Sequence, residues 1–259
     1  MLIGNDLILP DWPAPANVRG CTTTRRGGVS RGPFASLNLA LHVGDDEGAV
    51  TANRERLRSA LDLPAEPLWL AQVHGRGTVC VEGVRAAGAG AGTCPPPEAD
   101  AAVTHRPGQV CAVLTADCLP LLLCDRAGTC CAAVHAGWRG LHGGVIEAAV
   151  ARLGVPGAEM LAWLGPAIGP ARFEVGPEVR AAFVDHDPGA AVAFRAGAGD
   201  RWLADLYALA RRRLAAAGVT RVSGGGLCTA GDAARFFSYR RDGRTGRMAS
   251  LVWLAGDAA

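Results

Sequence analysis

The most apolar stretch of the chain, residues 110–140, combines two buried-strand patterns with ionisable residues. The segments VCAVLTADCLPLLLC and TCCAAVHA are rich in Val, Leu, Cys and Ala, and a polar turn at residues 125–128 separates them. Continuous apolar runs bounded by turn residues predict strands that are buried on both faces. Asp117 and Cys118 lie inside the first run, and His135 lies near the end of the second. Because an ionisable group in an apolar strand is costly unless it is paired or bound, this stretch is the first candidate for chemistry.

Helix and strand patterns alternate irregularly around this stretch. Apolar spacing predicts helices at residues 45–61, 141–153, 177–183 and 201–217, with Asp200 as the cap of the last helix. Strand patterns cover the start of residues 18–43 and residues 68–75, 99–105, 160–170, 191–196 and 247–254. The absence of a strict strand–helix repeat predicts a mixed α/β (α+β) fold, a single domain over residues 1–259 with mixed sheets flanked by helices. Residues 84–97, rich in Ala, Gly and Pro, are expected to form a flexible surface loop within it.

Composition narrows the function classes. The 259 residues are 49% hydrophobic with a net charge of +2, and all 26 basic residues are Arg, so no clustered basic surface indicates a nucleic-acid partner. No apolar run reaches the ~20 residues that span a bilayer, and the N-terminus has no basic region of a signal peptide. Nine cysteines, an odd number lying mostly in apolar strands, predict free thiols and a cytoplasmic location. The oligomeric state is left open.

Residues 18–43 pass from a strand into a Gly-rich loop. Arg25, Ser36 and Asn38 lie close together in this loop with several glycines. Glycines allow close backbone approach, while Arg and hydroxyl groups donate hydrogen bonds, so an anion or a polyol could bind here. A solvated surface loop explains the same composition.

Three residues at or near the ends of predicted strands, His74, Cys118 and His135, suggest a common site. Two imidazoles and a thiolate suit Zn²⁺ or copper, and three protein ligands with one open position are typical of a catalytic zinc. The same residues allow a Cys118 nucleophile with His135 as its base and Asp117 as an orienting group. A buried core cysteine beside a structural histidine is the third interpretation.

Six segments resemble, in order, the motifs of one family. They are TTRRGGVSRGPFASLNLALHVGDD (23–46), AQVHG (71–75), TADCLPLLL (115–123), AAVHAGWRG (132–140), LGPAIGPARFEVGPEV (164–179) and FFSYRRDGRTGRMASLVWL (236–254). The family is that of the former multicopper polyphenol oxidase or laccase-domain proteins (peptidoglycan editing factor-like), now largely described as purine nucleoside phosphorylases. The resemblance runs from residue 20 to residue 254. One departure is Arg172-Phe173-Glu174, where many members carry Cys-Tyr-Glu.

The resemblance implies a fold like the catalytic domain of cytotoxic necrotizing factor toxins. It also implies a zinc site made by His74, Cys118 and His135, with copper as a less favoured metal. The implied activities are phosphorolysis of adenosine, inosine, guanosine and methylthioadenosine, with phosphate as co-substrate, and deamination of adenosine.

We expect Asp117 to be the candidate for proton transfer, and Arg25, with Ser36, Asn38 or Arg139, to bind phosphate or nucleoside. Arg240, Arg241 and Arg247 are weaker candidates. Three alternatives stay open. They are a copper-dependent polyphenol oxidase (laccase), a Cys–His hydrolase acting on peptidoglycan precursors, and a metal-binding module without catalytic activity.

Overall fold

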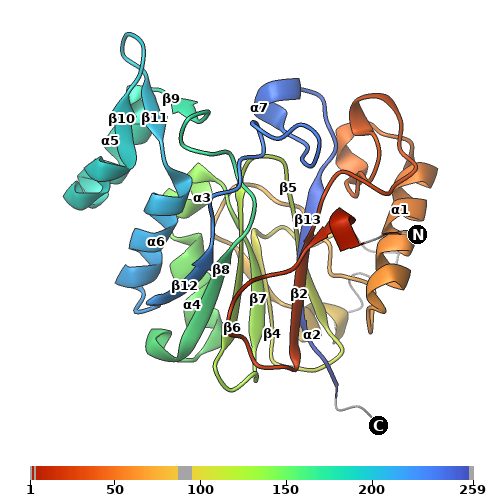
Figure 1. Ribbon diagram of the computed structural model, residues 1–259. Coiled ribbons are helices and arrows are strands. Elements are labelled where there is room, and N and C mark those ends of the chain that lie inside the picture. The colour runs from red at the N-terminus through yellow and green to blue at the C-terminus, as the bar shows by residue number, and fades with distance from the viewer. Residues whose placement is uncertain (1, 3, 87–94, 257–259) are drawn as a thin grey trace.

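Two stacked β-sheets form the centre of the computed structural model, which describes residues 2, 4–86 and 95–256 (Figure 1). A four-stranded sheet packs against one face of a six-stranded sheet, and helices cover the outer face of each. The layers therefore run helix, sheet, sheet, helix. The predicted mixed α/β class is confirmed. No helix in the described part of the chain is both long and apolar enough to span a bilayer.

The six-stranded sheet has the order β12-β8-β6-β7-β4-β3. Its strands are β3 (Thr78–Cys80), β4 (Ala101–Thr104), β6 (Leu119–Asp125), β7 (Cys131–Ala136), β8 (Met160–Leu164) and β12 (Arg221–Gly224). The four central strands pair antiparallel, whereas β3 and β12 pair parallel to their neighbours at the two edges. Every residue of β6 and β7 is buried, which explains their continuous apolar sequences.

The four-stranded sheet is antiparallel and has the order β1-β2-β13-β5. Its strands are β1 (Leu7–Ile8), β2 (Val18–Thr23), β5 (Val110–Thr115) and β13 (Met248–Leu254). The layer between the sheets includes Val113 of β5, Val252 of β13, Leu122 of β6 and Ala133 of β7. Because one strand of each sheet lies on either side of residues 116–118, this short link carries the chain from one sheet to the other.

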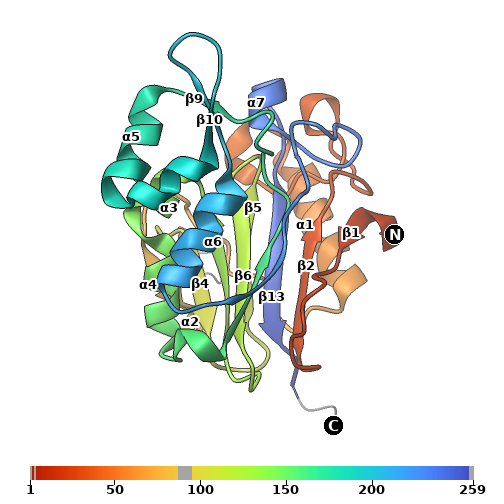
Figure 2. The same ribbon diagram turned by 60° about the vertical axis from the view of Figure 1, so that its left-hand side comes forward.

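Helices complete the two outer layers. They are α1 (Glu47–Leu61), α2 (Val81–Ala86), α3 (Trp138–Gly143), α4 (Val145–Leu153), α5 (Pro177–His186), α6 (Leu206–Ala216) and α7 (Tyr239–Asp242). Short 3-10 helices lie at Gly4–Asp6, Gly32–Phe34, Leu41–Val43, Gly157–Glu159 and Pro188–Ala193. A small third sheet, in the order β10-β11-β9, lies beside α5 and consists of β9 (Glu174–Val175), β10 (Phe194–Ala196) and β11 (Trp202–Ala204). Figure 2 shows this sheet and α5 standing at one end of the α3–α4–α6 layer.

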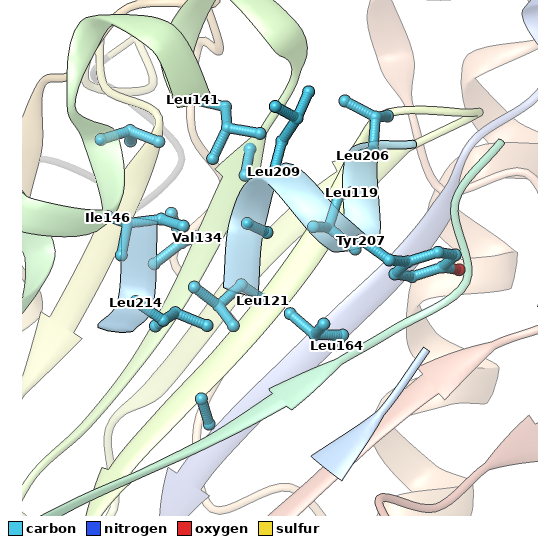
Figure 3. Close-up of a cluster of buried hydrophobic side chains, with 14 of the residues drawn as sticks. Leu119, Leu121, Val134, Leu141, Ile146, Leu164, Leu206, Tyr207, Leu209 and Leu214 are labelled. Carbon is cyan, nitrogen blue, oxygen red and sulfur yellow. The ribbon is translucent and has the colours of Figure 1, made fainter. Parts of the chain in front are cut away.

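The largest apolar cluster joins this helical layer to the six-stranded sheet (Figure 3). Leu206, Leu209 and Leu214 of α6 share this cluster with Leu121 and Leu164 of the strands. Burial of each such side chain contributes about 1.5–3 kcal/mol relative to an exposed one. The strand ends that carry the motif residues are therefore held between two packed layers.

The apolar run 110–124 is two strands in two different sheets, β5 and β6, rather than the single strand predicted. Asp117, with φ of 96°, lies in the link between them. Periodicity could not reveal this break because both strands are buried on both faces and the link is short.

Other predicted elements differ in their bounds. Residues 68–75 make only isolated bridges at Leu68 and Ala71, and the predicted helix 141–153 is interrupted by Gly144, whose φ is 94°. The predicted strand 160–170 ends at Leu164, and the strand expected over 191–196 begins at Phe194. The predicted helix 201–217 begins at Leu206, since Asp205, not Asp200, accepts the capping hydrogen bond from Ala208 N–H.

The loop predicted over residues 84–97 is only partly described by the structure, and its first residues are helical. Residues 84–86 belong to α2, and residues 87–94 lie outside the described residues.

Candidate metal centre

The structure brings His74, Cys118 and His135 together at one end of the six-stranded sheet. His74 lies in the loop before β3, Cys118 in the link before β6, and His135 in β7. One potential ligand atom from each residue lies within 4.8 Å of the other two. Cys118 Sγ is 3.8 Å from His74 Nε2, and the two imidazole rings are edge to face with centroids 4.8 Å apart. Three donors from distant segments thus face a common point.

Asp100, a buried carboxylate outside the predicted site, positions two of the three residues. Asp100 Oδ1 is 2.8 Å from His135 Nδ1, so Nδ1 carries the proton and Nε2 is left to face Cys118 and His74. The same carboxylate accepts backbone N–H bonds from Val73, His74 and Gly75. Nothing in the local sequence EADAAV distinguishes Asp100 from an ordinary loop aspartate. Its signal is spatial, because histidines that bind metals usually donate their other N–H to an oxygen acceptor.

The backbone is left-handed on both sides of the site. His74 has φ of 60° and Asp117 has φ of 96°, a region that non-glycine residues rarely occupy. Hydrogen bonds hold both residues there: Asp100 binds the amide of His74, and the Asp117 carboxylate accepts from Thr229 Oγ1, Ser238 Oγ and the Arg240 N–H. Such strained positions persist only where their surroundings enforce them.

Two glycines of the HAGWRG motif are required by close packing. A Cβ at Gly137 would lie 3.0 Å from both Cys118 Sγ and His74 Cδ2. A Cβ at Gly140 would lie 2.7 Å from the Gly75 carbonyl oxygen. The turn from β7 into α3 therefore lies directly against the side chains of Cys118 and His74.

Electrostatics couple Cys118 to His135. Burial opposes ionisation of the thiol, but His135 and His74 together lower the pKa of Cys118 to about 6. Burial also opposes the charged imidazole, yet the Cys118 thiolate and Asp100 raise the pKa of His135 to about 9. Burial raises the pKa of Asp100, but the bonds from His135 and Gly75 outweigh it, so the net shift is downward. In the metal-free state near neutral pH, the arrangement favours a thiolate beside an imidazolium.

The donor set fits a zinc or copper ion. One thiolate and two imidazole nitrogens are soft and borderline ligands that Mg²⁺ or Ca²⁺ would not select. Three protein ligands facing a cavity are the arrangement of a catalytic rather than a structural zinc. The three-residue site expected from the sequence is therefore present as geometry, while the identity of a bound metal stays a prediction.

A cavity of about 240 Å³ opens beside the three donors. It is lined by His42, Gln72, His74, Leu114, Thr115, Ala116, Cys118, His135, Tyr239 and Arg247. Gln72 is fixed by paired amide bonds to the backbone of Leu114 at 2.7 and 2.8 Å. Arg247 is the guanidinium on this wall, and His42 and Tyr239 stand near it. Of these wall residues, only Arg247 and the three donors were named from the sequence as candidate site residues, although His42, Gln72 and Tyr239 lie within the motifs.

The Gly-rich loop shapes the wall from behind. Asn38 is fully buried, and its Oδ1 accepts the Arg247 backbone N–H at 2.9 Å. Ser36 Oγ donates to the Arg25 carbonyl, and Arg25 Nε donates to the Ala35 carbonyl while its guanidinium lies over the Phe237 ring. Neither Arg25, Ser36 nor Asn38 is among the described residues that line the cavity. Their predicted contact with a ligand stays a prediction, and their bonds favour a role in positioning.

Arg139 and Asp117, predicted to bind a ligand and to transfer a proton, have surroundings that do not favour these roles. Arg139 is exposed and stacks on the Trp138 ring, with 4.5 Å from guanidinium carbon to ring centre. The Asp117 carboxylate is engaged by Thr229, Ser238 and the Arg240 amide, which favours a structural role. Proton transfer by Asp117 stays a prediction without geometric support.

Comparisons with known proteins agree on one family. Residues 19–255 match the family model described as multi-copper polyphenol oxidoreductase laccase. A Pseudomonas aeruginosa protein named purine nucleoside phosphorylase PA4543 is 57% identical over 251 residues, which cover 96% of this chain and 99% of that protein. The Escherichia coli protein named purine nucleoside phosphorylase YfiH is 52% identical over 248 residues, which cover 96% and 98% of the two chains.

Solved structures show the same likeness. The Neisseria meningitidis protein NMB0706 has a TM-score of 0.90 at 51% identity, with 97% of this chain and 100% of that chain covered. YlmD from Geobacillus stearothermophilus has a TM-score of 0.91 at 32% identity, with 99% and 98% covered.

We expect Asp100→Asn to weaken metal binding about 10–100-fold, because an asparagine cannot accept all the N–H bonds that orient His135 and residues 73–75. Competition with a chromogenic chelator measures the affinity. Asp125→Asn is the matched control: this buried carboxylate binds Thr129 and the Cys130 amide beyond β6, away from the site. Equal metal affinity in Asp100→Asn and Asp125→Asn would contradict the positioning role of Asp100.

In the metal-free protein, we expect the Cys118 thiol to ionise as the pH rises through about 6. Because the pKa is lowered, the thiolate is present above that value and lost below it, and it pairs with the His135 imidazolium up to pH about 9. The rate of iodoacetamide labelling, measured against pH in chelator and corrected with Cys118→Ser, reports this titration. A rate that rises only through the ordinary thiol range would show that the pair does not form.

Proposed function

The chain belongs to the multi-copper polyphenol oxidoreductase laccase family, and we propose that it is a zinc-dependent purine nucleoside phosphorylase that also deaminates adenosine. The relatives named purine nucleoside phosphorylase cover almost the whole chain and support an enzyme of that kind. The observation that carries the proposal is the convergence of His74, Cys118 and His135 on a cavity wall beside a guanidinium. Adenosine, inosine, guanosine and methylthioadenosine are the proposed substrates.

The cavity suits a reaction in which one part of the nucleoside is buried and another stays near solvent. Its volume of about 240 Å³ is below the ~300–1,000 Å³ typical of sites that enclose a whole small ligand. Tyr239, 63% exposed, offers an aromatic face on which a purine can stack. We therefore propose that the ribose and the reacting bond lie toward Cys118 and that the base contacts Tyr239.

Arg247 is the proposed phosphate ligand. Its Nη1 donates to the carbonyls of Thr245 and Gly246, and its Nε and Nη2 make no hydrogen bond within the described part of the chain. Asn38 holds its backbone from the SLN motif. A guanidinium fixed in this way can bind two phosphate oxygens at once. This proposal transfers the phosphate role from Arg25 and Arg139 to Arg247.

The bonds that break and form in the two reactions determine which roles the side chains of the site must perform. In phosphorolysis, a phosphate oxygen attacks ribose C1′ and the bond to the purine nitrogen breaks, giving ribose 1-phosphate and the free base. In deamination, water replaces the amino group at C6 and ammonia leaves. A bound Zn²⁺ supplies Lewis-acid chemistry. The chain itself orients His135 through Asp100 and holds the phosphate with Arg247.

A second candidate function is supported by one specific observation. Cys118, His135 and Asp100 have the order of thiol, imidazole and carboxylate found in cysteine hydrolases, and the pKa values of Cys118 and His135 are shifted toward an ion pair. A hydrolase of peptidoglycan precursors would need this pair without metal. A copper-dependent polyphenol oxidase would need several coppers, whereas only two of the six histidines belong to the three-donor site.

Incubation of the zinc-loaded protein with adenosine and phosphate tests the proposed function. We expect adenine and ribose 1-phosphate with phosphate, and inosine and ammonia without it. Cys118→Ala should abolish both, since it removes the only sulfur ligand of the site. Cys130→Ala, a buried cysteine outside the site, should retain both.

Three results would overturn the function proposal. Full turnover by metal-free Cys118→Ala would reject the role of the site. Peptide hydrolysis in chelator would favour the hydrolase. Phenol oxidation that depends on copper would favour the oxidase.

We expect Arg247→Ala to lower kcat/KM for phosphate about 10–100-fold, since a charge-assisted hydrogen bond is worth about 1.5–3 kcal/mol. Deamination, which uses no phosphate, and zinc content should change little. Arg139→Ala is the matched comparison because its guanidinium is exposed outside the cavity. Loss of phosphate affinity in Arg139→Ala alone would return the role to Arg139.

A further inference from the structure

A second group of potential metal ligands lies at the other end of β3 and β4. Cys80 is the last residue of β3, Glu82 lies in α2, and His105 directly follows β4. One sulfur, one carboxylate oxygen and one imidazole nitrogen lie within 4.8 Å of one another. The candidate metal centre lies where β4 begins and β7 ends, so the two groups occupy opposite ends of the sheet. Figure 1 shows α2 at the end of the sheets away from α7.

The orientation of the His105 ring directs a lone pair into the group. His105 Nε2 lies 3.0 Å from the Leu153 carbonyl oxygen, which can only accept a hydrogen bond, so Nε2 carries the proton. In the neutral ring, Nδ1 then has a lone pair and faces Glu82 Oε1 at 3.8 Å, beyond hydrogen-bonding distance. A backbone carbonyl that fixes one ring nitrogen is the usual support for a histidine that binds a metal through the other.

Glu82 accepts one well-formed hydrogen bond, and the Cys80 thiol and the Thr104 hydroxyl lie near its carboxylate. Oε1 accepts the His105 backbone N–H at 3.0 Å. Oε2 is buried and has no hydrogen-bond partner of ordinary geometry in the described part of the chain. A thiol is a weak hydrogen-bond donor, and a cation held by Cys80, Glu82 and His105 would replace the contact between Cys80 and Glu82 with metal coordination.

We propose that Cys80, Glu82 and His105 bind a second zinc ion. The set of sulfur, nitrogen and oxygen donors suits Zn²⁺ and excludes Mg²⁺ and Ca²⁺, which select oxygen. The Cys80 thiol would release its proton on binding. The ion would join the edge strand β3 to α2 and to the end of β4. This proposal does not depend on the nucleoside chemistry.

Zinc counting on the full-length protein tests the proposal. The chain is stripped with a chelator, reloaded with zinc, passed through zinc-free gel filtration and analysed for metal. The wild type should retain two zinc ions per chain, and His74→Ala/Cys118→Ser, which lacks the first site, should retain one. His105→Ala in that background should retain none, and because this side chain is 43% exposed the substitution should not prevent folding. His186→Ala, another exposed histidine, is the matched control and should not change the count.

A cobalt spectrum identifies the ligand. Cobalt bound to the His74→Ala/Cys118→Ser protein should show a thiolate charge-transfer band, and adding Cys80→Ser should remove it. Glu82→Gln, which keeps the shape and removes the charge, should weaken binding in the same background. Absence of retained zinc in His74→Ala/Cys118→Ser, or zinc that His105→Ala does not release, would overturn the second site.

Discussion

The carboxylate of Asp100 is the contact on which the candidate metal centre depends. It is fully buried and binds both His135 Nδ1 and the backbone of residues 73–75. One charged group therefore sets the tautomer of one donor and the loop conformation of another. Because His74 has an unfavourable φ, its position requires a partner that outweighs the cost of that backbone conformation. A neutral or shorter side chain at residue 100 could not do both.

The third donor is fixed by the crossing between the two sheets. Cys118 follows Asp117 in the link from β5 to β6, and the Asp117 carboxylate is bound by Thr229, Ser238 and the Arg240 amide. These partners come from the segments before and within α7, so the same contacts hold Tyr239 beside the cavity. Packing of both sheets under helices then leaves the strand ends little freedom. The donors are accordingly placed by the fold before any ligand binds.

The site residues and the central strands could be predicted from the sequence wherever a local motif or apolar pattern marks them. His74, Cys118 and His135 each belong to a short motif, and the apolar runs indicated the buried central strands. The role of Asp100 could not be predicted, because a carboxylate before a strand has no local sequence pattern that distinguishes it. The break between β5 and β6 at Asp117 could not be predicted, because apolar residues on both sides give the sequence pattern of one continuous strand. The helix starting at Leu206 was predicted too early because Asp200 and Asp205 are both plausible caps, and only pairing of β11 selects the second.

The Gly-rich loop within residues 18–43 illustrates a different limit. Arg25, Ser36 and Asn38 form a pattern that suggests ligand binding, yet their polar atoms bind neighbouring backbone. Asn38 acts on the cavity indirectly, through the amide of Arg247, more than two hundred residues away. Sequence can identify such residues as a group but cannot say which of them faces the ligand, because that depends on tertiary contacts.

The central claim is that one thiolate and two imidazoles share a metal ion. X-ray absorption at the zinc edge of the Glu82→Gln/His105→Ala protein, which lacks the second proposed site, tests it most directly. The account predicts one sulfur at about 2.3 Å and two imidazole nitrogens at about 2.0–2.1 Å. A zinc shell without sulfur, or with oxygen donors alone, would contradict it.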